Sequence, residues 1–543
     1  MRSLYKYLIP LICLVCSVAC TNISREKSEK PNIILIMADD MGYSDPGCFG
    51  SEIHTPNLNR LVQEGMRMTQ FYNAGRCCPT RASLLTGLYQ HQAGIGDMVS
   101  NFGIPAYQGY LNDNCATLAE ALKLNGYNTY MSGKWHVGGS EENWPRKRGF
   151  DRFFGLIDGA TNYFKLVPYR NNQEAPKMAL DDQRFYPPDS GFYITDAFTE
   201  YALKFLDQRK SKKEPFFLFL AYTAPHWPLH ALPEDIARYR GKYLIGWDSL
   251  RIQRYQKMIK SGIIDSDWPL SPRHDSEVPA WNTLNNEEKE MWDLRMAVYA
   301  AMIDRMDQGI GKVLIKLDEI NEINNTLIIF ISDNGGCHER IKNLGNYITT
   351  TGTPGSPDSF DSYEYNWANA SNTPFRWFKH WVHEGGISAP CIVWFPKMIK
   401  AGRIDKRPAH IIDIMPTFTE LAGGIYPDSL NGKPVKSMMG KSLVPVFKNI
   451  NIEWERILLW EHEGNRAVRK GDWKLVSRYD QDAGGFTPWE LYNLAKDRTE
   501  LNDLSSDLPD KTKEMIELYE KMAREAEVTP WDEVLKVRNQ NRR

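Results

Sequence analysis

Four nearly uninterrupted runs of apolar residues stand out along the first 430 positions, at 32–38, 216–221, 326–331 and 391–395. A strand buried on both faces of a parallel sheet shows this continuous pattern, whereas a half-exposed strand alternates. Between the runs, 117–125 and 296–317 repeat apolar residues every three or four positions, as amphipathic helices do. Strands alternating with helices predict an α/β domain, in which a large mixed, mostly parallel sheet is sandwiched by helices.

Polar residues end three of the apolar runs. Asp39-Asp40 follow the first run, Pro225-His226 come shortly after the second, and Ser332-Asp333-Asn334 end the third. Functional groups of α/β domains gather at the carboxyl edge of the sheet. We therefore expect these side chains to lie near one another.

The pattern changes after about residue 430. Short apolar stretches at 457–460, 467–469 and 473–476 are separated by polar turns, which predicts a small antiparallel sheet, and 511–527 has one apolar helical face. We predict a catalytic α/β domain over 31–430 and a smaller α+β domain over 431–543. The segment 231–286 is rich in Trp, Arg and Pro, and we expect it to be an insertion that forms part of a cleft wall.

The amino terminus has the features of an export signal. Arg2 and Lys6 precede an apolar stretch at 8–16, and small residues follow up to Cys20. This stretch is too short to span a bilayer and is typical of a secretory signal. Residues 17–20 also resemble a lipobox, which predicts lipidation of Cys20; cleavage near Ala19 without an anchor is the alternative.

The export signal predicts where the protein works. Residues 1–20 are the predicted signal, and the polar stretch 21–30 is a tether. We expect the protein in the periplasm, or on the outer membrane or cell surface as a lipoprotein. The N-terminal lipid is the only membrane attachment that we expect.

Charge and cysteine content exclude several protein classes. The 543 residues include 66 Lys and Arg against 68 Asp and Glu, a formal net charge of −2, so no positive field recruits nucleic acid. A chain of this length buries a large core without disulfide staples. Three of the nine cysteines lie in the signal, and the other six show no zinc-binding spacing.

Two pairs of polar residues have the chemistry of a metal site. Asp39-Asp40 and Asp333-Asn334 offer hard oxygen ligands, which suit Ca²⁺ or Mg²⁺ and not zinc. Taken alone, either pair also fits a strand-end turn or a helix cap. Their recurrence at the ends of two buried strands favours the metal site.

The stretch Cys77-Cys78-Pro79-Thr80-Arg81, followed by Thr86-Gly87, matches the sulfatase signature CxPSRxxxxTG, with Thr80 at the usual Ser position. The chain resembles the type I sulfatases of the alkaline phosphatase superfamily, and bacterial arylsulfatases in particular. Two buried thiols before a helix would explain the cysteines alone, but not the proline, arginine and Thr-Gly at this spacing.

The resemblance implies that a maturation enzyme oxidises Cys77 to formylglycine (3-oxoalanine). The hydrate of this aldehyde attacks sulfur with one hydroxyl and releases sulfate through the other, which a thiol cannot do. A divalent cation next to it lowers the pKa of the diol and holds a sulfate oxygen. The resemblance implies Ca²⁺, with Mg²⁺ less favoured, bound by Asp39, Asp40, residue 77, Asp333 and Asn334.

The remaining family motifs supply the other expected site residues. Gly133–Gly138 matches the GKWH element, so Lys134 is expected to contact the diol and the sulfate, and His136 to hold or deprotonate the second hydroxyl. His226 is the expected general acid and binds the ester oxygen. Lys379, in an NxPxRxxK element, is expected to bind sulfate, and Arg81 to brace the diol and the metal carboxylates. His230 and Arg376 are the less favoured neighbours.

The expected reaction is hydrolysis of sulfate monoesters, with aryl sulfates as assay substrates. Sulfated galactose or N-acetylhexosamine of mucin or algal glycans is the expected natural class. Trp227, Trp247, Asn101 and His91 are candidate pocket residues. One alternative is a formylglycine phosphonate or phosphate monoester hydrolase, which Asn334 disfavours because those enzymes tend to carry His there. Another is a non-catalytic lipoprotein that binds sulfated glycans and keeps a thiol at Cys77.

Overall fold

The large sheet of this protein has eleven strands and follows the order β10-β2-β9-β8-β1-β7-β3-β4-β5-β6, with β11 paired to β2. The computed structural model describes residues 30–209, 213–274, 276–341 and 352–540. The predicted signal, Cys20 and all of the tether except Lys30 lie outside these residues. The strands are β1 Asn32–Ala38, β2 Met66–Tyr72, β3 Asn128–Gly133, β4 Arg152–Leu156, β5 Met178–Leu180, β6 Gln183–Phe185, β7 Phe216–Ala221, β8 Thr326–Ser332, β9 Ser388–Trp394, β10 Arg403–Asp405 and β11 Ala409–His410.

The centre of the sheet is parallel. Strand β1 pairs in parallel with β8 on one side and with β7 on the other, and β7 pairs in parallel with β3. All residues of β1, β7 and β8 are buried, as their continuous apolar sequence predicts. The antiparallel strands β9, β5 and β6 lie toward the two edges, so the sheet is mixed and mostly parallel, as predicted.

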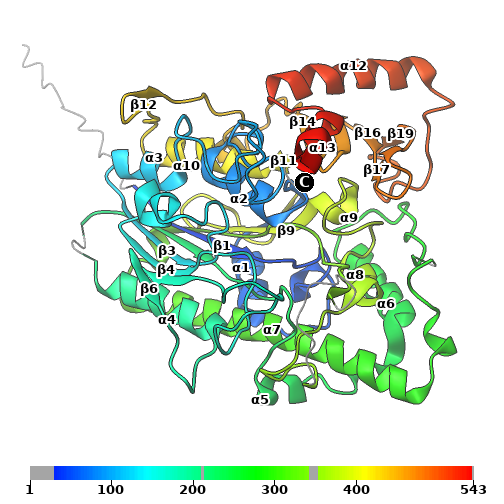
Figure 1. Cartoon of the computed structure of the whole chain (residues 1–543), viewed down its shortest axis with the longest axis horizontal. Coiled ribbons are helices and arrows are strands. Elements are labelled where there is room, and N and C mark those ends of the chain that lie inside the picture. Colours follow the sequence, from blue (N-terminus) through cyan, green and yellow to red (C-terminus); the bar gives the residue numbers. More distant parts are fainter. Residues whose placement is uncertain (1–29, 210–212, 275, 342–351, 541–543) are drawn as a thin grey trace, which may run out of the picture. The chain divides into compact units, whose positions relative to one another are not determined.

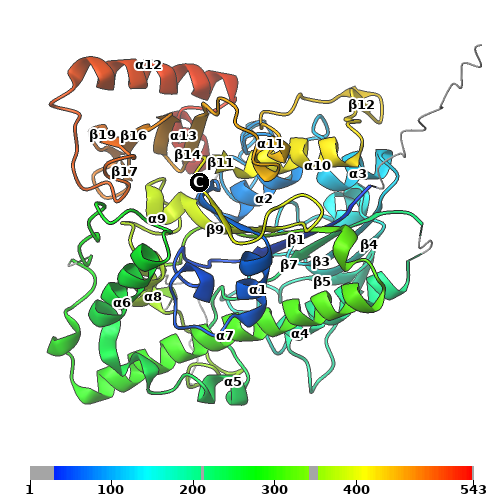
Figure 2. The same cartoon turned by 180° about the vertical axis from the view of Figure 1, so that it is seen from behind.

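Helices cover both faces of the sheet (Figures 1 and 2). The helices are α1 Pro56–Glu64, α2 Cys77–Thr86, α3 Leu118–Leu124, α4 Ile194–Asp207, α5 Pro233–Ala237, α6 Gly246–Lys260, α7 Asn286–Glu319, α8 Glu364–Ser371, α9 Glu384–Ile387, α10 Ile414–Ala422, α11 Val444–Phe447, α12 Pro509–Glu525 and α13 Trp531–Gln540. Ile34 and Ile36 of β1 pack in one core with α1, α4 and α7, and Ile33 and Leu35 pack in the other core with α2, α3 and α10. This sandwich confirms the predicted α/β class.

The predicted central helix is longer than its apolar repeat. The repeat at 296–317 is buried within α7, but the helix already begins at Asn286, because Asn285 and Glu288 form a capping box there. The polar first turns of α7 are exposed and leave no apolar signal. The end of the helix, at Glu319, agrees with the prediction.

The carboxyl-terminal region contains the predicted antiparallel sheet. Its strands are β14 Ile457–His462, β15 Asn465–Lys470, β16 Trp473–Ser477 and β19 Glu490–Asn493. Met515 and Tyr519 of α12 pack in the same core as Leu475 of β16. Residues 31–543 form one compact unit, so this sheet packs onto the α/β region, and the boundary near 430 stays a prediction.

Buried charges join the two regions. Glu384 of α9 pairs with Lys474 of β16 at 3.1 Å and with Arg498 at 2.9 Å, and all three side chains are fully buried. Arg498 also donates to the carbonyl of Thr69 in β2 at 2.7 Å. These contacts connect the large sheet to the small one through one side-chain network.

The segment 231–286 contributes some buried side chains to the core, while many of its residues are exposed. Trp247 of α6 is fully buried, with its ring 4.7 Å from Trp281 and 5.4 Å from Trp367. Of the described residues in this segment, His274, Ser276 and Glu277 line a cavity. Among the described residues, Cys48, Cys77, Cys78, Cys115, Cys337 and Cys391 are free thiols, and no helix is long and apolar enough to cross a membrane.

Candidate active site

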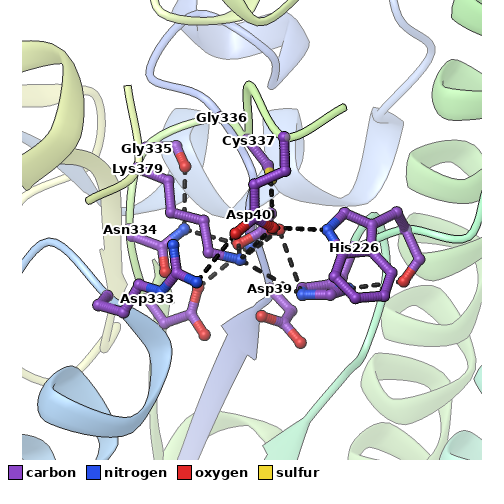
Figure 3. Close-up of polar contacts among 12 residues, drawn as sticks. Asp39, Asp40, His226, Asp333, Asn334, Gly335, Gly336, Cys337 and Lys379 are labelled. Carbon is purple, nitrogen blue, oxygen red and sulfur yellow. Dashed lines mark hydrogen bonds and ion pairs between the residues drawn. The ribbon is translucent and has the colours of Figure 1, made fainter. Parts of the chain in front are cut away.

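The acidic residues that follow β1 and β8 meet at the carboxyl edge of the sheet (Figure 3). The two strands are parallel neighbours with Ala38 opposite Ser332, so the residues after them are adjacent. The backbone N–H of Asp40 donates to Asp333 Oδ1 at 3.1 Å, and Asn334 Nδ2 donates to Asp40 Oδ1 at 2.7 Å. The structure thus brings together the four polar residues that the sequence singled out.

This cluster fits a hard divalent cation. Asp39 Oδ1 and Asn334 Oδ1 are buried and have no hydrogen-bond partner among the described residues. Burial raises the pKa of Asp39, and burial together with the Asp39 carboxylate raises the pKa of Asp333 to about 8. Ionising both carboxyl groups therefore costs free energy, and a bound cation would lower that cost. Carboxylate and amide oxygens are the ligands that such ions prefer.

Cys77 begins helix α2, so the amide end of the helix faces the acidic cluster. Arg81, one turn later, donates from NH2 to Asp333 Oδ2 at 2.9 Å and from NH1 to the carbonyl of Lys134 at 2.8 Å. Lys134, just after β3, pairs with Asp39 Oδ2 at 2.6 Å. Arg81 and Lys134 thus hold α2 and β3 against the acidic cluster.

The surroundings of Cys77 stabilise an anion. A hydrogen bond with Cys78, followed by the charge of Lys134, holds the pKa of the Cys77 thiol well below its usual range, although burial opposes this. His136 Nε2 lies 3.3 Å from Cys78 Sγ, and burial lowers the pKa of His136 to about 4. A negative group attached to residue 77 is therefore favoured, while His136 stays neutral and able to accept a proton.

His226 lies in the loop between β7 and α5. Its Nδ1–H donates to the carbonyl of Trp227 at 2.6 Å, which leaves Nε2 facing Asp40 at 3.5 Å and Lys379 Nζ at 3.3 Å. The Tyr163 hydroxyl contacts the carbonyl of His226 at 2.8 Å. Burial lowers the pKa of His226 to about 4, although the Asp40 carboxylate opposes this. A further anion near Nε2 favours the imidazolium.

Lys379 completes the set of predicted residues. Its Nζ pairs with Asp40 Oδ1 at 2.8 Å. Burial lowers the pKa of Lys379, but the neighbouring acidic groups, Asp40 first among them, together outweigh burial and raise this pKa well above its usual range. His230 and Arg376 lie elsewhere. His230 bonds to the carbonyl of Ser359, and Arg376 donates to the carbonyl of Glu500 at 2.7 Å.

The sequence reasoning missed Arg76 and Glu339. Arg76 NH2 pairs with Glu339 Oε1 at 2.9 Å, and Trp227 Nε1 donates to Glu339 Oε2 at 2.8 Å. Glu339 Oε2 also lies 3.9 Å from Lys379 Nζ. Arg76 could have been predicted as a site residue from its position next to Cys77. Glu339 has no such signal, because it lies three residues beyond the motif at 332–336 and belongs to no motif itself.

A cavity of about 710 Å³ opens over these groups. Cys77, His136, His226, Trp227 and Lys379 line it, together with stretches at 98–100, 158–160 and 173–177. The pocket prediction is therefore right for Trp227 and wrong for the other three residues. Trp247 is a core residue, His91 is buried with its Nε2 2.6 Å from Glu461 Oε2, and Asn101 accepts from Gly103 in its own exposed loop.

Known proteins resemble this chain along most of its length. The family model described as Sulfatase matches residues 31–425, and the model for the C-terminal region of N-sulphoglucosamine sulphohydrolase matches 374–527. An uncharacterized sulfatase of Schizosaccharomyces pombe is 38% identical over 536 residues, covering 91% of this chain and 93% of the relative. An arylsulfatase of Klebsiella aerogenes is 37% identical over 433 residues, covering 77% and 92%.

A solved structure agrees with the sequence relatives. The crystal structure of Ps i-CgsB in complex with k-i-k-neocarrahexaose has 29% sequence identity and a TM-score of 0.66, and covers 91% of this chain and 93% of its own. The chain therefore belongs to the sulfatase family of the alkaline phosphatase superfamily and is a sulfuric ester hydrolase.

Proposed function

We propose that this protein removes sulfate from sulfated glycans through formylglycine formed from Cys77, with Ca²⁺ in the adjacent acidic cluster. One observation carries the proposal: Cys77 lies at the amino end of α2, in a cavity with Lys134, His136, His226 and Lys379 around it. The reaction converts a sulfate monoester and water to an alcohol and inorganic sulfate.

The proposed groups fit the residues present. Asp39, Asp40, Asp333 and Asn334, with residue 77, would hold Ca²⁺; the free oxygens of Asp39 and Asn334 support this. Ca²⁺ is favoured over Mg²⁺ because it accepts more oxygen ligands in a less regular geometry. Formylglycine hydrate supplies a hydroxyl nucleophile for sulfur and a second hydroxyl for release of sulfate, and Ca²⁺ supplies charge that attracts a sulfate oxygen.

The chain's own residues bind the sulfate and move the protons. Lys134 and Lys379 place two ammonium groups beside the acidic cluster, where they offset the negative charge of a bound sulfate. His136, held neutral by burial, accepts the proton of the second hydroxyl. His226 Nε2 donates a proton to the leaving oxygen, since the sulfate anion favours its protonated form.

The proposed substrates are sulfate esters of galactose or N-acetylhexosamine in mucin or algal glycans. Supporting this, an N-acetylglucosamine-6-O-sulfatase of Bacteroides thetaiotaomicron is 25% identical over 572 residues, and the crystal structure described above is of a complex with k-i-k-neocarrahexaose. Aryl sulfates are the proposed assay substrates, as for the Klebsiella relative. The N-terminal features support export and a lipid on Cys20, and maturation of Cys77 requires a formylglycine-generating enzyme as partner.

The test combines mass spectrometry with turnover. The protein is co-expressed with a maturation enzyme, and the tryptic peptide 77–81 is examined for an aldehyde in place of the Cys77 thiol. Hydrolysis of p-nitrophenyl sulfate and p-nitrophenyl phosphate is compared with Ca²⁺ present, and defined sulfated sugars are screened for sulfate release.

We expect the aldehyde and a preference for sulfate. A preference for phosphate would instead identify a phosphate or phosphonate monoester hydrolase. A retained thiol without turnover would identify a glycan-binding protein, and a retained thiol with full activity would refute the formylglycine mechanism. Release of sulfate from the aryl ester and from none of the sugars would refute the glycan substrates alone.

A further inference from the structure

A second cavity, of about 990 Å³, adjoins the active-site cavity and has no part in the reaction described above. Both cavities are lined by Arg76 and Glu339, whose side chains form the 2.9 Å ion pair described above. Glu339 also contacts Trp227 and Lys379, which line the active-site cavity. The two cavities therefore adjoin each other at this ion pair.

Aromatic side chains line the second cavity. Tyr365, Trp377, Trp381 and Tyr479 are half-buried there. The rings of Trp377 and Trp381 are 4.8 Å apart, and the guanidinium of Arg478 lies 4.4 Å above the ring of Trp377. Aromatic faces next to polar groups suit a ligand that has both an apolar face and hydrogen-bonding edges. A sugar ring has this character, with C–H groups on its faces and hydroxyls at its rim.

The backbone of this cavity is strained at three lining residues. Trp377 has a φ of 66°, His380 of 91° and Glu463 of 48°, all in the left-handed region that disfavours residues with a side chain. Asp40 and His136, in the active site, share this conformation, with φ of 66° and 56°. Such strain persists where the surrounding structure enforces it, and it clusters at functional sites.

One short segment serves both cavities. Lys379 reaches the active site, while its neighbours Trp377, His380 and Trp381 line the second cavity. The segment is also tied to the site's first helix, since the N–H of His380 donates to the carbonyl of Gly75 at 2.8 Å, two residues before Cys77. A ligand in the second cavity therefore contacts the residues next to a sulfate-binding lysine.

The charge of the second cavity is mixed. Arg340, Arg478 and Arg538 line it together with Glu277, Glu463, Asp480 and Asp482. Groups of both signs produce no field that would attract an anion. They do provide donors and acceptors for the hydroxyls of an uncharged ring.

From these observations we propose that the second cavity binds an unsulfated sugar unit next to the sulfated one. The enzyme then acts on sulfated units within oligosaccharides in preference to free monosaccharide sulfates. This inference rests on the proposed sulfatase function, and deepens it by naming the form of the substrate.

The test compares three kinds of substrate. The probes are p-nitrophenyl sulfate, galactose and N-acetylglucosamine 6-sulfates, and disaccharides in which the same sulfated sugars carry one unsulfated galactose. For the wild-type protein we expect kcat/KM to be at least about tenfold higher for a disaccharide than for its monosaccharide. A tenfold difference corresponds to about 1.4 kcal/mol of added binding free energy. In Trp377→Ala and Arg478→Ala, which alter two separate segments, the disaccharide-to-aryl ratio of kcat/KM should fall about tenfold, mainly through KM.

Two further variants separate recognition from folding. Trp377→Phe keeps an aromatic face and should restore most of the ratio. Trp281→Ala removes a half-buried tryptophan that lines neither cavity and should leave the ratio unchanged.

Three results would overturn the inference: monosaccharides that match disaccharides, ratios unchanged in both cavity variants, or aryl sulfate turnover without any disaccharide turnover. The absence of turnover of every sulfate by aldehyde-bearing protein would refute the proposed function as well.

Discussion

Two adjacent cysteines at the start of α2 have different chemistry, because their surroundings differ. Hydrogen bonding and positive charge depress the pKa of Cys77, whereas burial and the Cys77 group raise the pKa of Cys78 well above its usual range. The same element therefore offers one position that favours an anion and one that keeps a neutral thiol. Only the first has the environment that the proposed nucleophile needs.

Replacing each cysteine tests this difference. We expect Cys77→Ala to abolish turnover of p-nitrophenyl sulfate, since no other group can form the covalent bond to sulfur. Cys78→Ala should retain activity within about tenfold, because it removes the 3.3 Å contact to His136 and the hydrogen bond to residue 77, but no reacting atom. Initial rates measure both effects, with Cys77→Ala compared with wild type at equal amounts of folded protein and Cys78→Ala at equal formylglycine content. Equal losses in the two variants would contradict the assignment of Cys77.

His226 has a role that depends on the leaving group. We expect His226→Ala to lower kcat/KM by about 10²–10⁴-fold for an alkyl or sugar sulfate, whose alcohol needs a proton to leave. The loss should be much smaller for p-nitrophenyl sulfate, because its phenolate leaves unaided. Each substrate serves as the control for the other in rate measurements on one preparation. An equal loss on both would show that His226 only binds sulfate.

At the scale of elements, the ends of strands approach one another too closely for a side chain. Gly133 ends β3 with a φ of 130°, and a Cβ there would lie 1.9 Å from the carbonyl oxygen of Ala221 in β7. The next residue is Lys134. The close approach of β3 and β7 therefore sets the position of an active-site cation.

Gly133→Ala should destabilise the protein and reduce its activity. We expect a loss of at least about 2 kcal/mol in the free energy of unfolding, from backbone strain and the clash with Ala221. Gly139→Ala is the matched control, since a Cβ there meets no atom within 4 Å. Urea denaturation of both variants measures the difference. A stability of Gly133→Ala within 0.5 kcal/mol of wild type, about the scatter of surface substitutions, would refute the steric argument.

At the scale of the whole molecule, buried charges hold the small sheet on the large one. Burial alone would raise the pKa of Glu384, but Lys474 and Arg498 outweigh it and lower the pKa to about 2. Glu500 shares Lys474, and burial together with the Glu384 charge raises its pKa to about 7. The two carboxyls thus titrate as a coupled pair around one ammonium group.

The depressed pKa of Glu384 makes stability depend on pH. The folded-state pKa lies below the ordinary value of 4.5, so this stabilisation is complete above pH 4.5 and is lost as pH falls toward 2. Glu384→Gln should lose about 3 kcal/mol or more at pH 7, because it leaves Lys474 and Arg498 underneutralised. The difference from wild type should shrink at pH 3. Denaturant unfolding at both pH values tests this, and a difference that does not depend on pH would contradict it.

Metal binding should also stabilise the whole fold, because the acidic cluster joins β1 to β8. With Ca²⁺ at 100 times its dissociation constant, we expect about 2.7 kcal/mol of added stability. Thermal unfolding of Cys77→Ala protein, with Ca²⁺ or EGTA, measures this without turnover. Asp333→Asn in the same background should abolish the shift. An equal Ca²⁺-dependent shift in both proteins would show that the ion binds outside the acidic cluster.

The sequence alone determined much of this protein. The continuous apolar runs identified β1, β7, β8 and most of β9, because strands buried on both faces have no polar alternation. The short motifs around Cys77, Lys134 and Lys379 identified active-site residues, because their chemistry restricts both residue type and spacing. These signals are local, so they can be read along the chain.

Only the tertiary structure decided what depends on distant segments. Glu339 contacts Arg76 and Lys379, which lie 263 and 40 positions away along the chain, and no local pattern marks it. Trp247 was a candidate pocket residue from the sequence, but it lies in a tryptophan cluster of the core. The second cavity exists because distant stretches, near 277, 339, 378, 480 and 535, meet beside Arg76. Burial and proximity between such stretches arise from packing of the whole fold, and are absent from the order of residues.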